Sequence, residues 1–197
     1  MNGWQMRILP MVLAASGVAC SALFAKSEPL PVRYFAPPDR ARQVSVAPAE
    51  NVVPLRLGRV SGASHLDVRM IYRKAENELV YEDTARWSDN PTRYLSRALA
   101  QSLFEERKIP QAMSGRALTL EAQLLAFEAV QADSAERARV SVAVTLHDER
   151  TSRLVETITT EQALSGEGPD ELVRALSSAL DACVDQITER VLAELRS

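Results

Sequence analysis

The stretch ARVSVAVTLH, residues 138–147, is the clearest strand signal in the chain. Apolar side chains occupy every second position, and mainly polar ones lie between them. Because side chains alternate between the two faces of a β-strand, this pattern predicts a strand with one buried face and one wet face. The apolar set is Ala138, Val140, Val142, Val144 and Leu146, and the other set is Arg139, Ser141, Ala143, Thr145 and His147.

Two neighbouring segments are predicted to pair with this strand. LTLEAQLLAFEAV (118–130) precedes it, LVETITTEQAL (154–164) follows it, and polar turns separate the three. From Pro169 onward, one apolar stripe at spacings of three and four predicts a long final helix. The stripe consists of Leu172, Leu176, Leu180, Cys183, Ile187, Val191 and Leu195.

The first half of the chain combines short strands with another helix. Strands are predicted at 32–35 and 53–60, and RMIYR (69–73) and ELVYE (78–82) flank KAEN as a hairpin. Asn90 and Pro91 suit the cap and the first position of a helix that ends at Pro110. Its apolar stripe is Leu95, Ala98, Leu99 and Leu103.

The elements therefore follow the order strands, helix, three strands, helix. Strands grouped in this way, with two amphipathic helices, favour a sheet that buries one face under both helices. The sequence predicts an α+β fold, a two-layer sandwich with an antiparallel or mixed sheet and two helices on one face.

The N-terminus predicts an export signal. Arg7 precedes an apolar segment from residue 8 to about residue 18, and small residues follow. The first cysteine of the chain ends the stretch GVAC (17–20), which resembles a bacterial lipobox. At a lipobox, signal peptidase II cleaves before a cysteine that is joined to diacylglycerol. Cys20 is therefore the predicted lipid attachment site, and its acyl chains would hold the protein at a membrane.

This interpretation divides the chain into three parts. Residues 1–19 are the lipoprotein signal peptide, 20–31 a lipid-anchored tether, and 32–197 a single domain. Gly17 departs from the lipobox, in which Leu is usual three residues before the cysteine. Gly17 and Ala19 also suit the ordinary signal peptidase, and that cleavage remains the alternative.

Composition narrows the class of protein. The 197 residues are 46% hydrophobic and 25% charged, as in an ordinary globular domain, and the net charge is −3. Basic residues are dispersed along the chain, so no nucleic-acid partner is expected. Cys183 is predicted to be a small buried residue, and a Cys20–Cys183 disulfide is the competing interpretation.

The sequence indicates no catalytic centre. SHLD places Ser64, His65 and Asp67 together, but triads are assembled in space by a fold, and contiguous residues rarely reach that geometry. His147 beside Asp148 lies at a strand end, where polar turn residues are expected. We therefore expect no enzyme, no cofactor and no metal site.

The block MIYRKAENELVYEDTARWSDNPTRYLSRALAQSL, residues 70–103, resembles a known family. It is similar to the auxiliary lipoproteins of bacterial ABC-type lipid transport systems, which work beside proteins carrying the mammalian-cell-entry domain. The matching positions are Tyr72-Arg73, Tyr81, Trp87, Pro91, Leu95, Leu99 and Leu103, and PVRYFAPP (31–38) and the strand–strand–helix tail also agree. The Ser88-Asp89-Asn90 segment departs from the family pattern.

The resemblance implies a non-enzymatic, periplasm-facing lipoprotein that assists lipid traffic between membranes. It implies partners in a mammalian-cell-entry-domain protein and an ABC permease and ATPase, with a homo-oligomer as a further option. Ser21 after the cysteine resembles outer-membrane lipoproteins, because Asp at that position is the usual inner-membrane retention signal. A structural envelope-assembly lipoprotein unrelated to lipid transport is the alternative.

A sheet covered by helices on one side leaves its other side open to a partner. Leu125, Phe127, Val155 and Ala163 lie on the strands that flank 138–147, where they are expected to add an apolar patch to that open side. Leu125, Phe127 and Val155 are accordingly the predicted partner-binding residues, with lipid carried mainly by the partner.

Overall fold

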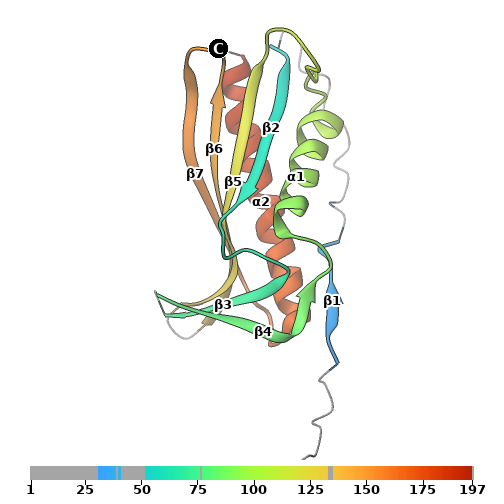
Figure 1. Cartoon of the computed structure of the whole chain (residues 1–197), viewed down its shortest axis with the longest axis vertical. Coiled ribbons are helices and arrows are strands. Elements are labelled where there is room, and N and C mark those ends of the chain that lie inside the picture. Colours follow the sequence, from blue (N-terminus) through green and yellow to red (C-terminus); the bar gives the residue numbers. More distant parts are fainter. Residues whose placement is uncertain (1–30, 39, 41–51, 76, 133–134, 197) are drawn as a thin grey trace, which may run out of the picture. The chain divides into compact units, whose positions relative to one another are not determined.

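The alternating strand and its neighbours form the largest part of the architecture. The computed structural model describes residues 31–38, 40, 52–75, 77–132 and 135–196. Their helices and strands are labelled in Figure 1. In chain order they are β1 (Arg33–Phe35), β2 (Leu55–Gly62), β3 (Arg69–Ala75), β4 (Glu78–Trp87), α1 (Pro91–Ala100), η2 (Gln101–Glu106), β5 (Leu118–Ala132), β6 (Ala135–His147), β7 (Ser152–Ala163) and α2 (Pro169–Leu195).

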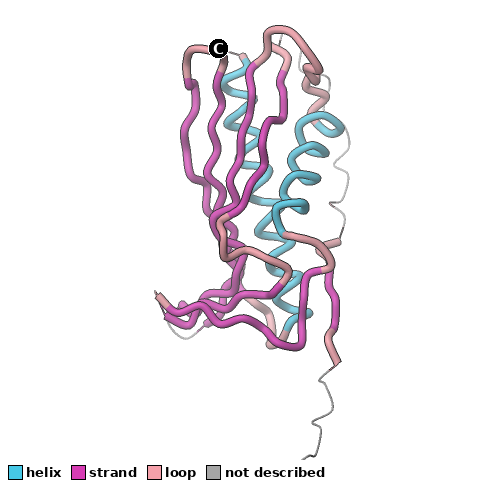
Figure 2. The backbone as a smooth tube through the Cα atoms, in the orientation of Figure 1, coloured by secondary structure: helices cyan, strands magenta, loops and turns pink. Residues whose placement is uncertain are grey.

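The seven strands form one mixed sheet, in which β5 pairs with β2, β3 and β6. The order is β1-β4-β3-β5-β6-β7, and β2 also pairs with β5. β2 runs parallel to the first half of β5, and β3 runs parallel to a later part of it, at Tyr72 and Ala129. β5, β6 and β7 are antiparallel. Figure 2 shows these three strands side by side, with the β3–β4 hairpin turning away at one end.

Both helices cover one face of this sheet, as predicted. α2 packs against β6 and β7, and α1 packs against β2 and α2. Every residue of the predicted α2 stripe is buried, and so are Leu95, Ala98, Leu99 and Leu103 before it. The even-numbered side chains of β6, from Ala138 to Leu146, are buried beneath the helices. The α+β fold is therefore confirmed, with a mixed sheet.

The start of α1 is fixed by its cap and by aromatic packing. The Asn90 side chain accepts a hydrogen bond from the Thr92 backbone N–H at 3.0 Å, and Pro91 occupies the first turn. Trp87 is buried and meets the Tyr94 ring edge-on, with the ring centroids 6.0 Å apart. The Tyr94 hydroxyl accepts from the Asp89 N–H at 2.9 Å. These contacts join the end of β4 to the helix.

The helix changes its winding before the predicted end at Pro110. After Ala100 the chain forms the π-helical segment η2, in which the Arg107 N–H bonds the Ser102 carbonyl five residues earlier. The Ser102 hydroxyl lies 2.9 Å from that of Thr188 on α2, and both side chains are buried. The wider turn thus coincides with a buried polar contact between the two helical segments.

Candidate functional site

The sheet face opposite α1 and α2 is the candidate partner-binding site. In the register of β6 and β7, Ser141 lies beside Thr159 and Thr145 beside Val155. Their side chains share the wet face that the alternation predicted. We call this surface the open face and define it as Arg139, Ser141, Ala143, Thr145 and His147 of β6 with Val155, Thr157, Thr159 and Glu161 of β7.

Cross-strand hydrogen bonds order the side chains of the open face. The hydroxyls of Ser141 and Thr159 lie 2.8 Å apart, and Arg139 Nε donates to Glu161 Oε1 at 2.8 Å. Opposed pairs of this kind stabilise a sheet modestly, by about 0.2–1 kcal/mol each. Val155 is the large apolar side chain on this face, and it is 74% exposed. The open face therefore offers a partner hydrogen-bonded polar pairs toward one end of β7 and an exposed hydrophobe toward the other.

The structure corrects the predicted position of Phe127. Its side chain is 1% exposed and lies under the helices, with its ring centroid 5.1 Å from that of Trp87. The reason is a β-bulge between Leu124 and Ala126, which leaves Leu125 without a Cα partner on β6. One extra residue reverses which side chains face the core, so Phe127 lies opposite buried Val140.

The other two predicted partner-binding residues have different surroundings. Leu125 is half-buried at the bulge, whereas Val155 is exposed on the open face. A role for either in binding remains a prediction.

A charged pair that the sequence analysis missed lies where β3 joins β5. Glu128 is buried, and its carboxylate accepts from Arg73 Nε at 2.7 Å and from Nη2 at 3.0 Å. This bidentate contact with Glu128 raises the pKa of Arg73. Arg73 belongs to the Tyr72-Arg73 pair that carried the family resemblance. Its contact with Glu128 joins β3 to β5, which gives that position a structural role.

Tyr72, the other member of the pair, is affected by burial. Burial, with Glu82 and Glu136 nearby, raises the pKa of Tyr72 to about 12.

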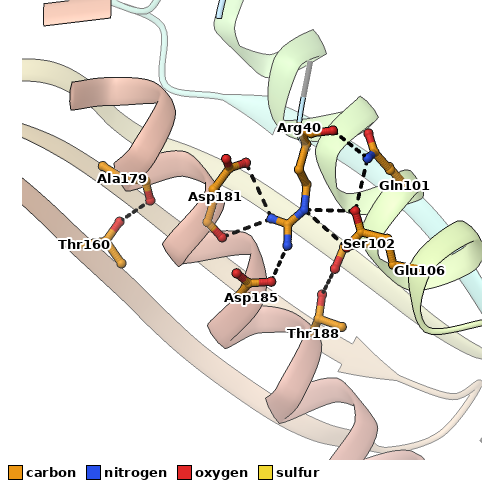
Figure 3. A network of polar contacts seen from close by, with 9 residues as sticks. All are labelled: Arg40, Gln101, Ser102, Glu106, Thr160, Ala179, Asp181, Asp185 and Thr188. Carbon is orange, nitrogen blue, oxygen red and sulfur yellow. Dashed lines mark hydrogen bonds and ion pairs between the residues drawn. The ribbon is translucent and has the colours of Figure 1, made fainter. Parts of the chain in front are cut away.

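A second polar network surrounds Arg40, between the helical segments (Figure 3). The Arg40 guanidinium is buried and donates to the Glu106 carboxylate at 3.2 Å and to the Asp181 carbonyl at 3.2 Å. It also pairs with Asp185, and its own backbone carbonyl accepts from Gln101 Nε2 at 3.1 Å. One arginine thus joins the chain after β1 to both η2 and α2.

Three carboxylates surround this single guanidinium. Burial lowers the pKa of Arg40, but hydrogen bonds and charges of Asp185 and Glu106 outweigh it and raise the pKa above the ordinary value. Burial raises the pKa of Asp181, against the attraction of Arg40 and with further repulsion from Asp185. We assign this network a structural role in holding the chain after β1 against the helices.

The structure describes only one of the two cysteines, Cys183. Cys20 and the lipobox lie outside the described residues, so lipid attachment there remains a prediction. Cys183 is a free thiol, fully buried, and its Sγ lies 3.8 Å from the Ile158 carbonyl. Burial raises the pKa of this thiol to about 12. Cys183 is therefore a core residue, as predicted.

The SHLD residues do not form a triad in the structure. The Asp67 carboxylate is occupied by Arg69, whose Nη2 lies 2.7 Å from Oδ2. This hydrogen bond lowers the pKa of Asp67. Within the described ranges, no group of three His, Cys, Asp or Glu side chains could hold a metal ion. None of the helices in those ranges is long and apolar enough to cross a membrane.

A known family model matches most of the chain. The family model described as "ABC-type transport auxiliary lipoprotein component" matches residues 37–188. This range contains the open face, both polar networks, α1 and the first part of α2, up to Thr188. No curated protein matches the sequence.

Solved structures share the fold at low sequence identity. A crystal structure of a protein from Xanthomonas campestris is 20% identical, with a TM-score of 0.71, and the match covers 82% of this chain and 96% of that one. A crystal structure of an uncharacterized protein is 13% identical, with a TM-score of 0.64, and covers 82% and 99% respectively. A hypothetical protein from Chlamydia trachomatis is 11% identical, with a TM-score of 0.50, covering 73% and 98%.

Proposed function

This chain belongs to the family of ABC-type transport auxiliary lipoprotein components, and we propose that it serves its transporter as a scaffold in lipid transport. In this proposal a lipid on Cys20 anchors the protein at the outer membrane, and the domain faces the periplasm. The open face contacts a partner, either the periplasmic part of a mammalian-cell-entry-domain protein or a second copy of the chain. The protein itself catalyses no reaction.

The packing between sheet and helices supports a scaffold rather than a lipid container. Large apolar side chains, including Trp87, Phe127 and Leu99, fill this space and are almost completely buried. The cavity beside Arg40 has a volume of about 310 Å³ and that near Arg56 about 590 Å³, and charged side chains line both. Neither offers acyl chains an apolar chamber, so we assign lipid carriage to the partner.

The exposure of Val155 is the observation that favours the open face as the partner-binding surface. Val155 is 74% exposed near the start of the edge strand β7, beside Thr145 of β6 and two residues before Thr157. Protein interfaces commonly combine an apolar core with a polar rim. The surface is also preformed, because its side chains already hydrogen-bond one another. Less ordering is then needed on binding.

Substitution of Val155 tests the proposal. Full chains carrying Val155→Glu or the matched control Met113→Glu are co-expressed with the mammalian-cell-entry-domain partner and purified in neutral detergent. Met113 is 85% exposed in the loop before β5 and is not one of the open-face residues. A buried unpaired carboxylate should weaken association at least about tenfold, or 1.4 kcal/mol, for Val155→Glu alone.

The same preparation distinguishes the competing mechanism. If the unchanged protein is monomeric, ignores the partner and extracts phospholipid from vesicles alone, the scaffold proposal fails and a lipid shuttle replaces it. Equal loss of partner in both variants would instead show that the effect is general to added charge.

A further inference from the structure

A cavity with many arginines lies at one end of the sheet. It is formed where β2 and β5 begin and where β6 turns into β7, ends that meet in Figure 1. Its volume is about 590 Å³. We call it the basic cavity and define it by the four arginines that line it, Arg56, Arg116, Arg150 and Arg153.

The sheet register brings these side chains together from distant parts of the sequence. Arg56 of β2 lies beside Thr119 of β5, which lies beside His147 of β6. His147 in turn pairs with Ser152, at the start of β7. Arg150 lies in the β6–β7 turn, Arg153 at the start of β7, and Arg116 in the loop that enters β5. The cavity therefore draws its arginines from two strands, at Arg56 and Arg153, and from the two adjoining loops, at Arg116 and Arg150.

The guanidinium groups in this cavity outnumber the carboxylates that line it. Among the described residues, the side chains of Arg116, Arg150 and Arg153 form no hydrogen bond or ion pair. Arg56 donates only to the Gly115 carbonyl, at 3.2 Å. Arg107, by contrast, pairs with Glu189 at 2.5 Å.

The acidic residues in the wall offset only part of this charge, and Asp148 attracts both Arg150 and Arg153. The cavity contains Asp148 and Glu149 against four arginines. Asp148 Oδ1 accepts the backbone N–H groups of Arg150 at 2.8 Å and Thr151 at 2.9 Å. Its carboxylate therefore holds the β6–β7 turn in shape. The turn presents Arg150 and Arg153 beside the hydroxyl groups of Thr119 and Thr151.

This arrangement fits a phosphate group. Guanidinium groups bind phosphate oxygens through paired hydrogen bonds, and hydroxyl groups add further donors. A volume near 590 Å³ lies in the range of small-molecule sites, which leaves room for a phosphate and the group that bears it. We propose that the basic cavity binds a phosphate group, supplied either as free phosphate or as an anionic phospholipid headgroup. This site does not depend on partner binding at the open face.

Paired arginine substitutions test the proposal. The full chain in neutral detergent is titrated with radiolabelled inorganic phosphate, and separately with short-chain phosphatidylglycerol or phosphatidylcholine. The test variant is Arg150→Gln with Arg153→Gln. The matched control is Arg93→Gln with Arg174→Gln, which removes the same charge from exposed positions on the helices. Thermal unfolding checks that both variants remain folded.

We expect the cavity variant to weaken phosphate binding at least tenfold, and the control to change it less than about twofold. Binding of phosphatidylglycerol with the same dependence, and not of phosphatidylcholine, identifies a lipid headgroup as the source. Binding of inorganic phosphate alone identifies free phosphate. The proposal is overturned if neither anion binds, or if the control variant loses as much affinity as the cavity variant.

Discussion

Replacing Phe127 by alanine should destabilise the protein strongly. The side chain is 1% exposed and packs edge-on against Trp87 with a centroid distance of 5.1 Å. Truncating a buried phenylalanine to alanine costs about 3–5 kcal/mol. Of this, about 0.5–1.5 kcal/mol reflects the geometry of the aromatic pair. In a domain of this size, each kcal/mol lowers the melting temperature by roughly 2–4 °C, so a fall of roughly 6–20 °C is expected.

The assay is urea and thermal unfolding of the full chain, followed by circular dichroism. Val155→Ala is the control, because Val155 is 74% exposed on the open face and should change stability by less than about 0.5 kcal/mol. A comparable loss in both variants, or a larger loss for Val155→Ala, would refute the assignment of faces. The bulge before Phe127 would then have been placed wrongly.

Four further predictions concern buried residues of the fold and the lipid anchor. Leu99→Ala and Leu180→Ala each remove a buried stripe residue and should cost about 2–5 kcal/mol in urea unfolding; losses within about 0.5 kcal/mol would contradict the helix faces. Burial raises the pKa of Asp181, so ionisation opposes folding above that pKa. Asp181→Asn should therefore stabilise the fold at pH 7, with an advantage that shrinks as the pH falls through the raised pKa and is lost by about pH 4. An effect that does not change with pH would argue against this. Burial raises the pKa of Cys183 to about 12, so the folded thiol keeps a proton that the unfolded thiol loses above about pH 9. Stability should fall between about pH 9 and 12, and iodoacetamide should label this thiol only after unfolding; rapid labelling of folded protein would count against its burial. Cys20→Ala should abolish metabolic labelling with palmitate, and labelling that persists would show that the lipid is attached elsewhere.

Local patterns were sufficient to predict most elements and both helix faces. The α2 stripe is visible because an amphipathic helix repeats every three or four residues. Asn90 and Pro91 mark a helix start because cap chemistry depends only on adjacent residues. The alternation in 138–147 likewise identified the wet side of β6.

Features that depend on distant contacts were not predictable in this way. The bulge at Leu125 changes the facing of Phe127, yet both residues continue an unbroken apolar run in the sequence. Arg40 meets Glu106 across 66 positions of the chain, and Arg73 meets Glu128 across 55. No short-range signal links such pairs.

Site-specific photo-crosslinking in intact cells tests the scaffold claim most directly. A photoreactive phenylalanine analogue is placed at Val155 on the open face and, as a control, at exposed Met113 in the loop before β5. The account predicts crosslinks from position 155 to the mammalian-cell-entry-domain protein or to a second copy of the chain, and far fewer from position 113. Protein crosslinks from position 113 alone, with none from position 155, would contradict it.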